Sequence, residues 1–173
     1  MCKRIIEEGR VSYLKAADIT NISTIYSEHE DAFSCGASVM FALVMQAMGK
    51  DDHLATSALE SLSVEIYEMV EKYTGFKVQG GMPIPSETIR ANTFGATWKF
   101  IKELNFKSLS KVDRLAVKTS YVAGGYLLIE EVKGLHDGTD EEAFAKLDIL
   151  QTETDTYGAM LDKRIFGKGV PIH

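Results

Sequence analysis

The stretch AFSCGASVMFALVMQAMG, residues 32–49, decides the fold class because it is the longest run in the chain without a charged residue. The run is far longer than a typical strand of about 5–6 residues. It contains no proline, and its Ala, Leu and Met residues favour a helix. Apolar residues cover most of the helix circumference, so we expect a helix that its neighbours bury.

A membrane span is the alternative interpretation of this run. A span needs about 20 apolar residues, whereas this run is shorter and contains Ser34, Ser38 and Gln46 near one helical stripe. It also lacks a cluster of Lys and Arg on one flank. We therefore expect the central helix of a soluble bundle and no membrane partner.

Length and composition restrict the class of protein. The chain has 173 residues, a net charge of −6, and 45% hydrophobic and 25% charged residues, which is typical of one globular domain. The acidic balance argues against a nucleic-acid partner, because such proteins usually carry a basic surface. Cys2 and Cys35 are too few for a disulfide framework, and no zinc-binding spacing is present. The first ten residues lack an apolar signal segment, so we expect a cytoplasmic protein.

Apolar residues recur at steps of three and four along most of the chain, which predicts further helices. These helices are expected at residues 3–26, 51–74, 86–105, 111–133 and 139–166. No strand pattern competes, and the sequence shows no internal repeat and no domain linker. The fold class is therefore all-α, a bundle of five or six helices in one domain, residues 1–173, with a tail at 167–173.

Local signals mark several helix ends. Capping-box spacing predicts helix starts at Ser27 with Glu30, at Ser110 with Asp113 and at Thr139 with Glu142. Gly75 is placed to end a helix. The polar segment TETDT, residues 152–156, is expected to bend its helix or to turn a polar group inward.

Contacts between helices or between subunits are indicated by glycines and by charge. Gly124 and Gly125 lie inside an expected helix, where each costs about 1 kcal/mol relative to Ala. Close approach of another helix or subunit would offset that cost. Residues 99–118 are basic and residues 130–162 are acidic. These blocks are either solvated faces or complementary contacts within the chain or between subunits. The expected partner is a second copy of the chain, in a homo-oligomer.

Two sets of residues are candidates for metal or thiol chemistry. His29, Glu30 and Asp31 could bind a metal together with His53, or could form a capped helix end with exposed charges. No carboxylate stands three residues before any histidine, so the di-iron signature is missing and we assign no metal. Cys35 is the candidate catalytic residue. A position near a helix N-terminus would lower its thiol pKa, whereas a lone Cys in an apolar run is commonly buried and inert.

A family resemblance concerns the same region. EDAFSCGASVMFALVMQAMGKDD resembles the N-terminal helix of a helical family named for its Cys/Gly-Cys-Ala-x-x-Gly/Cys/Cys pattern, for which a redox role is expected. The resemblance covers about residues 30–97 and includes Gly80-Gly81-Met82 and Gly95-Ala96. It implies a helical core rather than a function. The family's further cysteines are missing, with Ile89 and Arg90 in their place, so Cys35 alone cannot form an internal dithiol.

The loop QGGMPIPSETIR, residues 79–90, is the candidate ligand site. Gly80 and Gly81 allow backbone N–H groups to approach a ligand closely. A helix expected to begin near Ser86 would offer unpaired N–H donors, to which Ser86 and Thr88 add hydroxyls and Arg90 a guanidinium. These groups suit a small anionic ligand. The alternative is a structural loop with a serine cap.

Two functions remain open from the sequence. The first is a protein that binds a small anionic ligand near Cys35 and residues 79–90, with redox chemistry through Cys35 as an option. The second is a non-catalytic homo-oligomeric or interaction protein. The sequence identifies no cofactor, substrate or reaction.

Overall fold

The computed structural model describes residues 4–20, 23–75 and 93–166. Within these ranges the chain is helical and contains no strand, which confirms the all-α bundle. The elements, in chain order, are α1 (Ile5–Ala16), α2 (Tyr26–Met48), α3 (Asp52–Thr74), α4 (Thr93–Asn105), α5 (Lys111–Lys133), the short 3₁₀ helix η1 (Gly134–Asp137) and α6 (Asp140–Phe166).

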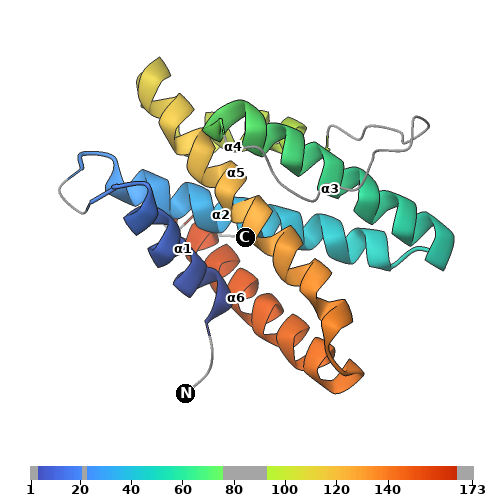
Figure 1. Cartoon of the computed structure of the whole chain (residues 1–173). Coiled ribbons are helices and arrows are strands. Elements are labelled where there is room, and N and C mark those ends of the chain that lie inside the picture. The colour runs from blue at the N-terminus through green and yellow to red at the C-terminus, as the bar shows by residue number, and fades with distance from the viewer. Residues whose placement is uncertain (1–3, 21–22, 76–92, 167–173) are drawn as a thin grey trace, which may run out of the picture.

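Helix α2 lies at the centre of the bundle, as its apolar run predicts, and crosses α5 there (Figure 1). Its residues Phe33, Ala37, Met40 and Val44 are almost completely buried. Among the described helices, α2 alone is long and apolar enough to cross a membrane, and 56% of that apolar stretch is buried inside the structure. Such burial is typical of the core helix of a bundle.

Glycines bring α2 and α5 into backbone contact. A Cβ atom on Gly36 would lie 1.9 Å from the Tyr121 carbonyl oxygen, and a Cβ on Gly124 would lie 1.9 Å from the Phe33 carbonyl oxygen. A Cβ on Gly125 would lie 2.4 Å from the Phe94 ring. The expectation that Gly124 and Gly125 lie at a helix–helix contact is therefore confirmed, and Gly36 joins them.

These two backbone contacts are reciprocal, which is the mark of two-fold symmetry. Gly36 touches the residue three before Gly124, and Gly124 touches the residue three before Gly36. The offset between the two glycines, 88 residues (36 to 124), also separates the first residues of α1 and α4 and those of α3 and α6. The fold is thus a three-helix unit used twice, with α1–α3 as the first half and α4–α6 as the second.

The prediction that the chain contains no internal repeat is therefore wrong at the level of structure. Few identities are retained at this offset, and they are Gly36/Gly124, Val44/Val132, Asp52/Asp140, Ala55/Ala143, Leu59/Leu147, Leu62/Leu150, Glu65/Glu153, Gly81/Gly169, Pro83/Pro171 and Ile84/Ile172. A minority of the other positions are apolar in both halves, such as Phe33/Tyr121 and Met40/Leu128, and any amphipathic helix shares that character. The repeat is visible because the backbone contacts are reciprocal.

A glutamate from each half caps the N-terminus of a helix in the other half. The buried carboxylate of Glu65 on α3 accepts N–H bonds from Thr93 (3.0 Å), Phe94 (3.2 Å) and Gly95 (2.7 Å) at the start of α4. The carboxylate of Glu153 on α6 accepts N–H bonds from Ile6 (3.0 Å) and Glu7 (3.2 Å) at the start of α1. Each half therefore supplies the anion that satisfies the helix N-terminus of the other half.

Several helix ends agree with the sequence. The Ser110 hydroxyl accepts from the Asp113 N–H, and the Thr139 hydroxyl accepts from the Glu142 N–H, as predicted. Gly75 adopts a left-handed conformation (φ 73°) after α3. The segment 152–156 turns polar groups inward, because Thr154 is buried and Glu153 caps α1.

Other expected ends and faces are wrong. Ser27 does not cap α2, which starts one residue earlier without a side-chain cap, and the Ser27 hydroxyl donates to Glu28 instead. The described part of α4 begins at Thr93, where Glu65 accepts its first N–H groups, and the predicted helix start near Ser86 lies outside the described residues. Leu54, Leu104 and Phe144 belong to the apolar stripes that recur at steps of three and four, which predicts that they face the core, but all three are exposed.

Candidate functional site

The predicted anion-binding loop lies outside the described residues. Gly80, Gly81, Ser86, Thr88 and Arg90 all belong to it, so their arrangement stays a prediction. The first N–H groups of the adjacent α4 are already bonded to Glu65. The anion that this helix N-terminus attracts is therefore a carboxylate of the chain itself.

Cys35 occupies the environment of a protonated thiol. It lies about two and a half turns after the start of α2 and is 5% exposed. Burial, with a smaller contribution from the negative charge of Asp31, raises the pKa of its thiol to about 12. At neutral pH the nucleophilic thiolate is therefore scarce.

His29 belongs to a buried hydrogen-bond network. Its Nδ1 lies 2.7 Å from the hydroxyl of Ser120, which also lies 3.2 Å from the Tyr13 hydroxyl. Burial lowers the pKa of His29. His53 is exposed on α3, and the described part of the chain holds no group of three side chains able to bind a metal. The interpretation of His29 as an exposed, charged helix start is therefore wrong, because its ring is part of the core.

A cavity of about 600 Å³ opens between α1, α2 and α6. Its inner wall includes Arg10 on α1, the stripe of Glu30, Ser34 and Ser38 on α2, and Tyr157 on α6. Its rim includes exposed residues such as Arg4 and Thr152. The volume lies in the range of small-molecule sites, about 300–1,000 Å³.

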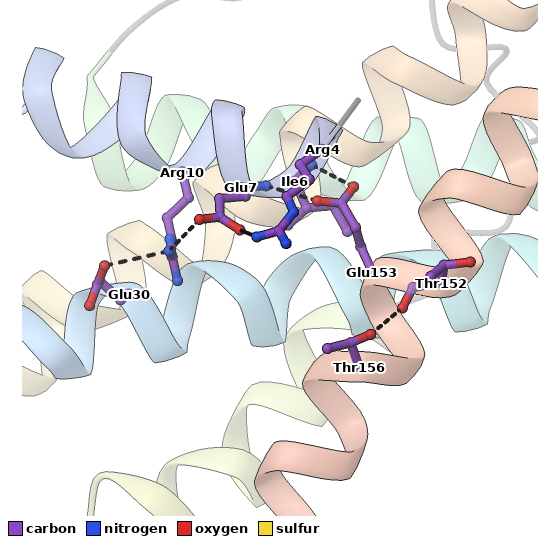
Figure 2. A network of polar contacts seen from close by, with 8 residues as sticks. All are labelled: Arg4, Ile6, Glu7, Arg10, Glu30, Thr152, Glu153 and Thr156. Atoms are coloured by element: carbon purple, nitrogen blue, oxygen red, sulfur yellow. Dashed lines mark hydrogen bonds and ion pairs between the residues drawn. The ribbon is translucent and has the colours of Figure 1, made fainter. Parts of the chain in front are cut away.

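Arg10 has an incomplete set of polar partners. Figure 2 shows its guanidinium reaching from α1 toward α2, where Nη2 lies 3.6 Å from Glu30 and 3.9 Å from Glu7. Glu7 pairs more closely with Arg4, at 2.8 Å. The Nε atom of Arg10 is buried and has no hydrogen-bond partner in the described structure. Its N–H group is therefore an unsatisfied buried donor in a residue that lines the cavity.

Ser38 presents a second buried polar atom without a partner. The residue lines the same cavity, and its hydroxyl oxygen is buried and has no hydrogen-bond partner among the described residues. Tyr157, by contrast, donates its hydroxyl to the Asp31 carbonyl oxygen at 2.6 Å. Because buried polar atoms in proteins are nearly always hydrogen bonded, the side chains of Arg10 and Ser38 require an explanation.

The second half of the molecule shows how this space can be filled. At the 88-residue offset, the positions of Arg10, Ser34 and Ser38 are taken by Trp98, Val122 and Tyr126. Trp98 is buried and stacks on Phe106 at 5.7 Å, and Tyr126 packs against Tyr67 at 5.9 Å. Large side chains thus occupy in one half the positions at which the other half has smaller or more polar residues around a cavity.

The sequence contained two signals for this site, although it did not join them. Ser34 and Ser38 interrupt the apolar run of α2 along one stripe, and the polar segment 152–156 lies on the facing helix. Arg10 gave no signal of its own. Neither Cys35 nor His29 is among the residues that line the cavity.

Comparisons with known proteins give no further guidance. No protein-family model, no curated protein and no solved structure matches the chain. The resemblance to a cysteine-containing helical family therefore stays a prediction, and function has to be inferred from the residues and their geometry.

Proposed function

We propose that this protein binds a small polar ligand in the cavity between α1, α2 and α6. The observation that carries the proposal is that two residues of one cavity lining, Arg10 and Ser38, each hold a buried polar atom without a hydrogen-bond partner, namely Nε and Oγ. An unpaired buried polar group costs about 1–3 kcal/mol. A bound ligand with hydrogen-bond acceptors would recover that cost.

The comparison between the two halves supports a role for the open cavity. An arrangement with Trp98 and Tyr126 shows that the same three-helix unit can be packed with large side chains. The first half has Arg10 and Ser38 at the equivalent positions and lacks that packing. A function that needs the open space gives a physical reason for the difference.

Cys35 is not part of this proposal. It does not line the cavity, and its raised pKa disfavours the thiolate. The anionic ligand expected at residues 79–90, and a redox role, remain separate predictions that concern other parts of the chain.

The test is a thermal-shift screen of amino acids, amines, carboxylates and phosphates on wild type and on Ser38→Tyr. A ligand at a hundredfold excess over its Kd stabilises the fold by about 2.7 kcal/mol. Ser38→Tyr introduces the residue found at the equivalent position of the other half, and it should remain folded but lose the ligand-dependent shift. Ser57→Tyr, at an exposed position of α3, is the matched control and should keep the shift. A shift that persists undiminished in Ser38→Tyr would place the ligand elsewhere.

A second candidate function is that of a homo-oligomeric or interaction protein. It is favoured by exposed apolar side chains within the basic block: Phe100 (66% exposed) and Leu104 (54%) one turn apart on α4, and Val112 (76%) at the start of α5. Sedimentation velocity should then show a defined oligomer that dissociates in the double variant Phe100→Ser, Leu104→Ser. A wild-type monomer at all tested concentrations would exclude self-association.

A further inference from the structure

We propose that copies of this chain associate head to tail, with the basic corner of one copy against the acidic corner of the next. The basic corner is the end of α4 with the start of α5, and the acidic corner is η1 with the start of α6. This inference rests on self-association, the second candidate function, and specifies the two surfaces that meet. It does not depend on the cavity.

The basic corner combines positive charge with exposed apolar side chains. Four large apolar residues are exposed there, and they are Phe100, Leu104, Val112 and Leu115. Three lysines of the corner are also exposed, and they are Lys99, Lys107 and Lys111. The two acidic residues of this stretch have partners of their own, because Glu103 pairs with Lys102 at 3.2 Å and Asp113 accepts from Ser110 at 2.7 Å. The corner therefore offers apolar contact area inside a net positive charge.

The acidic corner is its counterpart in charge and also contains an exposed aromatic ring. Asp140, Phe144 and Asp148 follow one another at steps of four residues, so they lie along one face of α6, and all three are exposed. Phe144 is 68% exposed. Asp137 on η1 and Glu141 add two further exposed carboxylates. A large apolar side chain is thus surrounded by negative charge.

The two corners cannot meet within one molecule. Helix α5 joins them, and its 23 residues span about 34 Å. Figure 1 shows the start of α5 and the start of α6 at opposite ends of the molecule. That separation is several times the Debye length of about 8 Å at physiological salt, so neither corner neutralises the other. A contact between these opposite charges therefore needs a second molecule.

The first half of the chain shows that the fold does not require these side chains. At the 88-residue offset, the four apolar residues of the basic corner are replaced by small or polar ones, namely Ser12, Ala16, Thr24 and Ser27. The three exposed lysines are replaced by uncharged residues, namely Val11, Ile19 and Ser23, and Phe144 is replaced by Thr56. A partner that covers the corners gives a physical reason for exposing large apolar side chains in one half only.

Charge selects the head-to-tail arrangement over a two-fold dimer. A two-fold axis through either corner would bring like charges together, whereas unlike corners attract each other. Head-to-tail contacts repeat from copy to copy, and they either close into a ring or continue as a chain. Because salt screens exposed charges, the association should weaken as the ionic strength rises.

The test is sedimentation velocity on two charge-reversed double variants, measured alone and mixed. Lys107→Glu with Lys111→Glu reverses the basic corner, and Asp137→Lys with Glu141→Lys reverses the acidic corner. Wild type should associate at about 50 mM salt and dissociate at about 500 mM. Each variant alone should associate about tenfold more weakly than wild type or less, because both of its corners then carry the same charge. An equimolar mixture should regain association, because each corner of one variant meets the opposite charge on the other.

Lys15→Glu with Lys50→Glu, at exposed positions outside both corners, is the control for net charge and should associate like wild type. Phe144→Ser changes no charge and should also weaken association, which keeps the test decisive if a charge-reversed variant does not fold.

An oligomer that persists in both charge-reversed variants would overturn the head-to-tail contact and leave self-association standing. Variants that dissociate alone and stay apart when mixed would overturn the contact as well. A wild type that is monomeric at low salt at every tested concentration would exclude self-association itself, and this contact with it.

Discussion

At the scale of single residues, burial determines the chemistry of the two candidates that the sequence placed near the start of α2. His29, predicted at an exposed and charged helix start, is hydrogen bonded to Ser120 in the core. Cys35, predicted as a candidate reactive thiolate, is a buried thiol with a raised pKa. In both cases desolvation disfavours the charged form of the side chain. The effect is opposite in direction for the two pKa values because histidine is charged when protonated and cysteine when deprotonated.

The lowered pKa of His29 predicts that acid destabilises the protein. Burial holds the folded-state pKa below 6.5, while the carboxylates of Glu28 and Asp113 act in the opposite direction with smaller effect. Below the unfolded value the unfolded chain binds the proton more readily, so the free energy of unfolding falls as pH falls through 6.5 and below. Urea midpoints measured between about pH 7.5 and 5.5 should therefore fall more steeply for wild type than for His29→Asn, which cannot titrate. Equal slopes would show that His29 does not contribute.

The raised pKa of Cys35 predicts slow modification. In a Cys2→Ser background, a thiol reagent at neutral pH should label Cys35 only at the rate of unfolding. In the folded protein the sulfur is buried and the thiol stays protonated. Labelling followed in the presence and absence of denaturant checks this. Fast labelling of the folded protein would restore Cys35 as a reactive thiol.

At the scale of elements, backbone contact between α2 and α5 fixes the centre of the fold. Gly36→Ala should lower the free energy of unfolding by about 3 kcal/mol or more, because the new methyl group would meet the Tyr121 carbonyl oxygen rather than a movable side chain. Gly158→Ala on α6, where a Cβ meets no atom within 4 Å, is the control and should stabilise by about 1 kcal/mol. Thermal and urea unfolding would measure both. A Gly36→Ala variant as stable as wild type would mean that the helices can separate at little cost.

The Glu65 cap should contribute similarly to the packing of α4. Glu65→Gln retains the shape of the side chain but removes the charge that three N–H groups and the helix dipole stabilise, with an expected loss of about 2 kcal/mol. Glu71→Gln on the same helix should change the free energy of unfolding by less than about 0.5 kcal/mol. A loss no larger than that of the control would show that the cap is dispensable.

At the scale of the whole molecule, the two halves are expected to unfold together. Each half provides a cap for the other, and their central helices share a backbone contact. Trp98, the only tryptophan, lies in the second half, so its fluorescence reports on α4, whereas far-UV circular dichroism reports on all helices. The two signals should follow one urea transition with the same midpoint. Separate midpoints would show that the halves are independent.

The sequence by itself determined the helical class and most of the local structure. The uncharged run at 32–49 identified the central helix, and caps at Ser110 and Thr139 placed the starts of α5 and α6. Gly124 and Gly125 indicated a close contact before its partner was known. These features are readable because helix periodicity, caps and glycine costs act within a few residues along the chain.

Only the tertiary structure decided which helices meet and what lies between them. The two-fold repeat, the exchange of Glu65 and Glu153 between halves, and the cavity beside Arg10 all join residues far apart in the chain. A cavity is a difference in packed volume between three helices, and an apolar stripe does not specify its partner or how closely that partner fits. For that reason the sequence could place Ser34 and Ser38 on one stripe, while their opening into a cavity with Arg10 became visible only once α1, α2 and α6 were packed together.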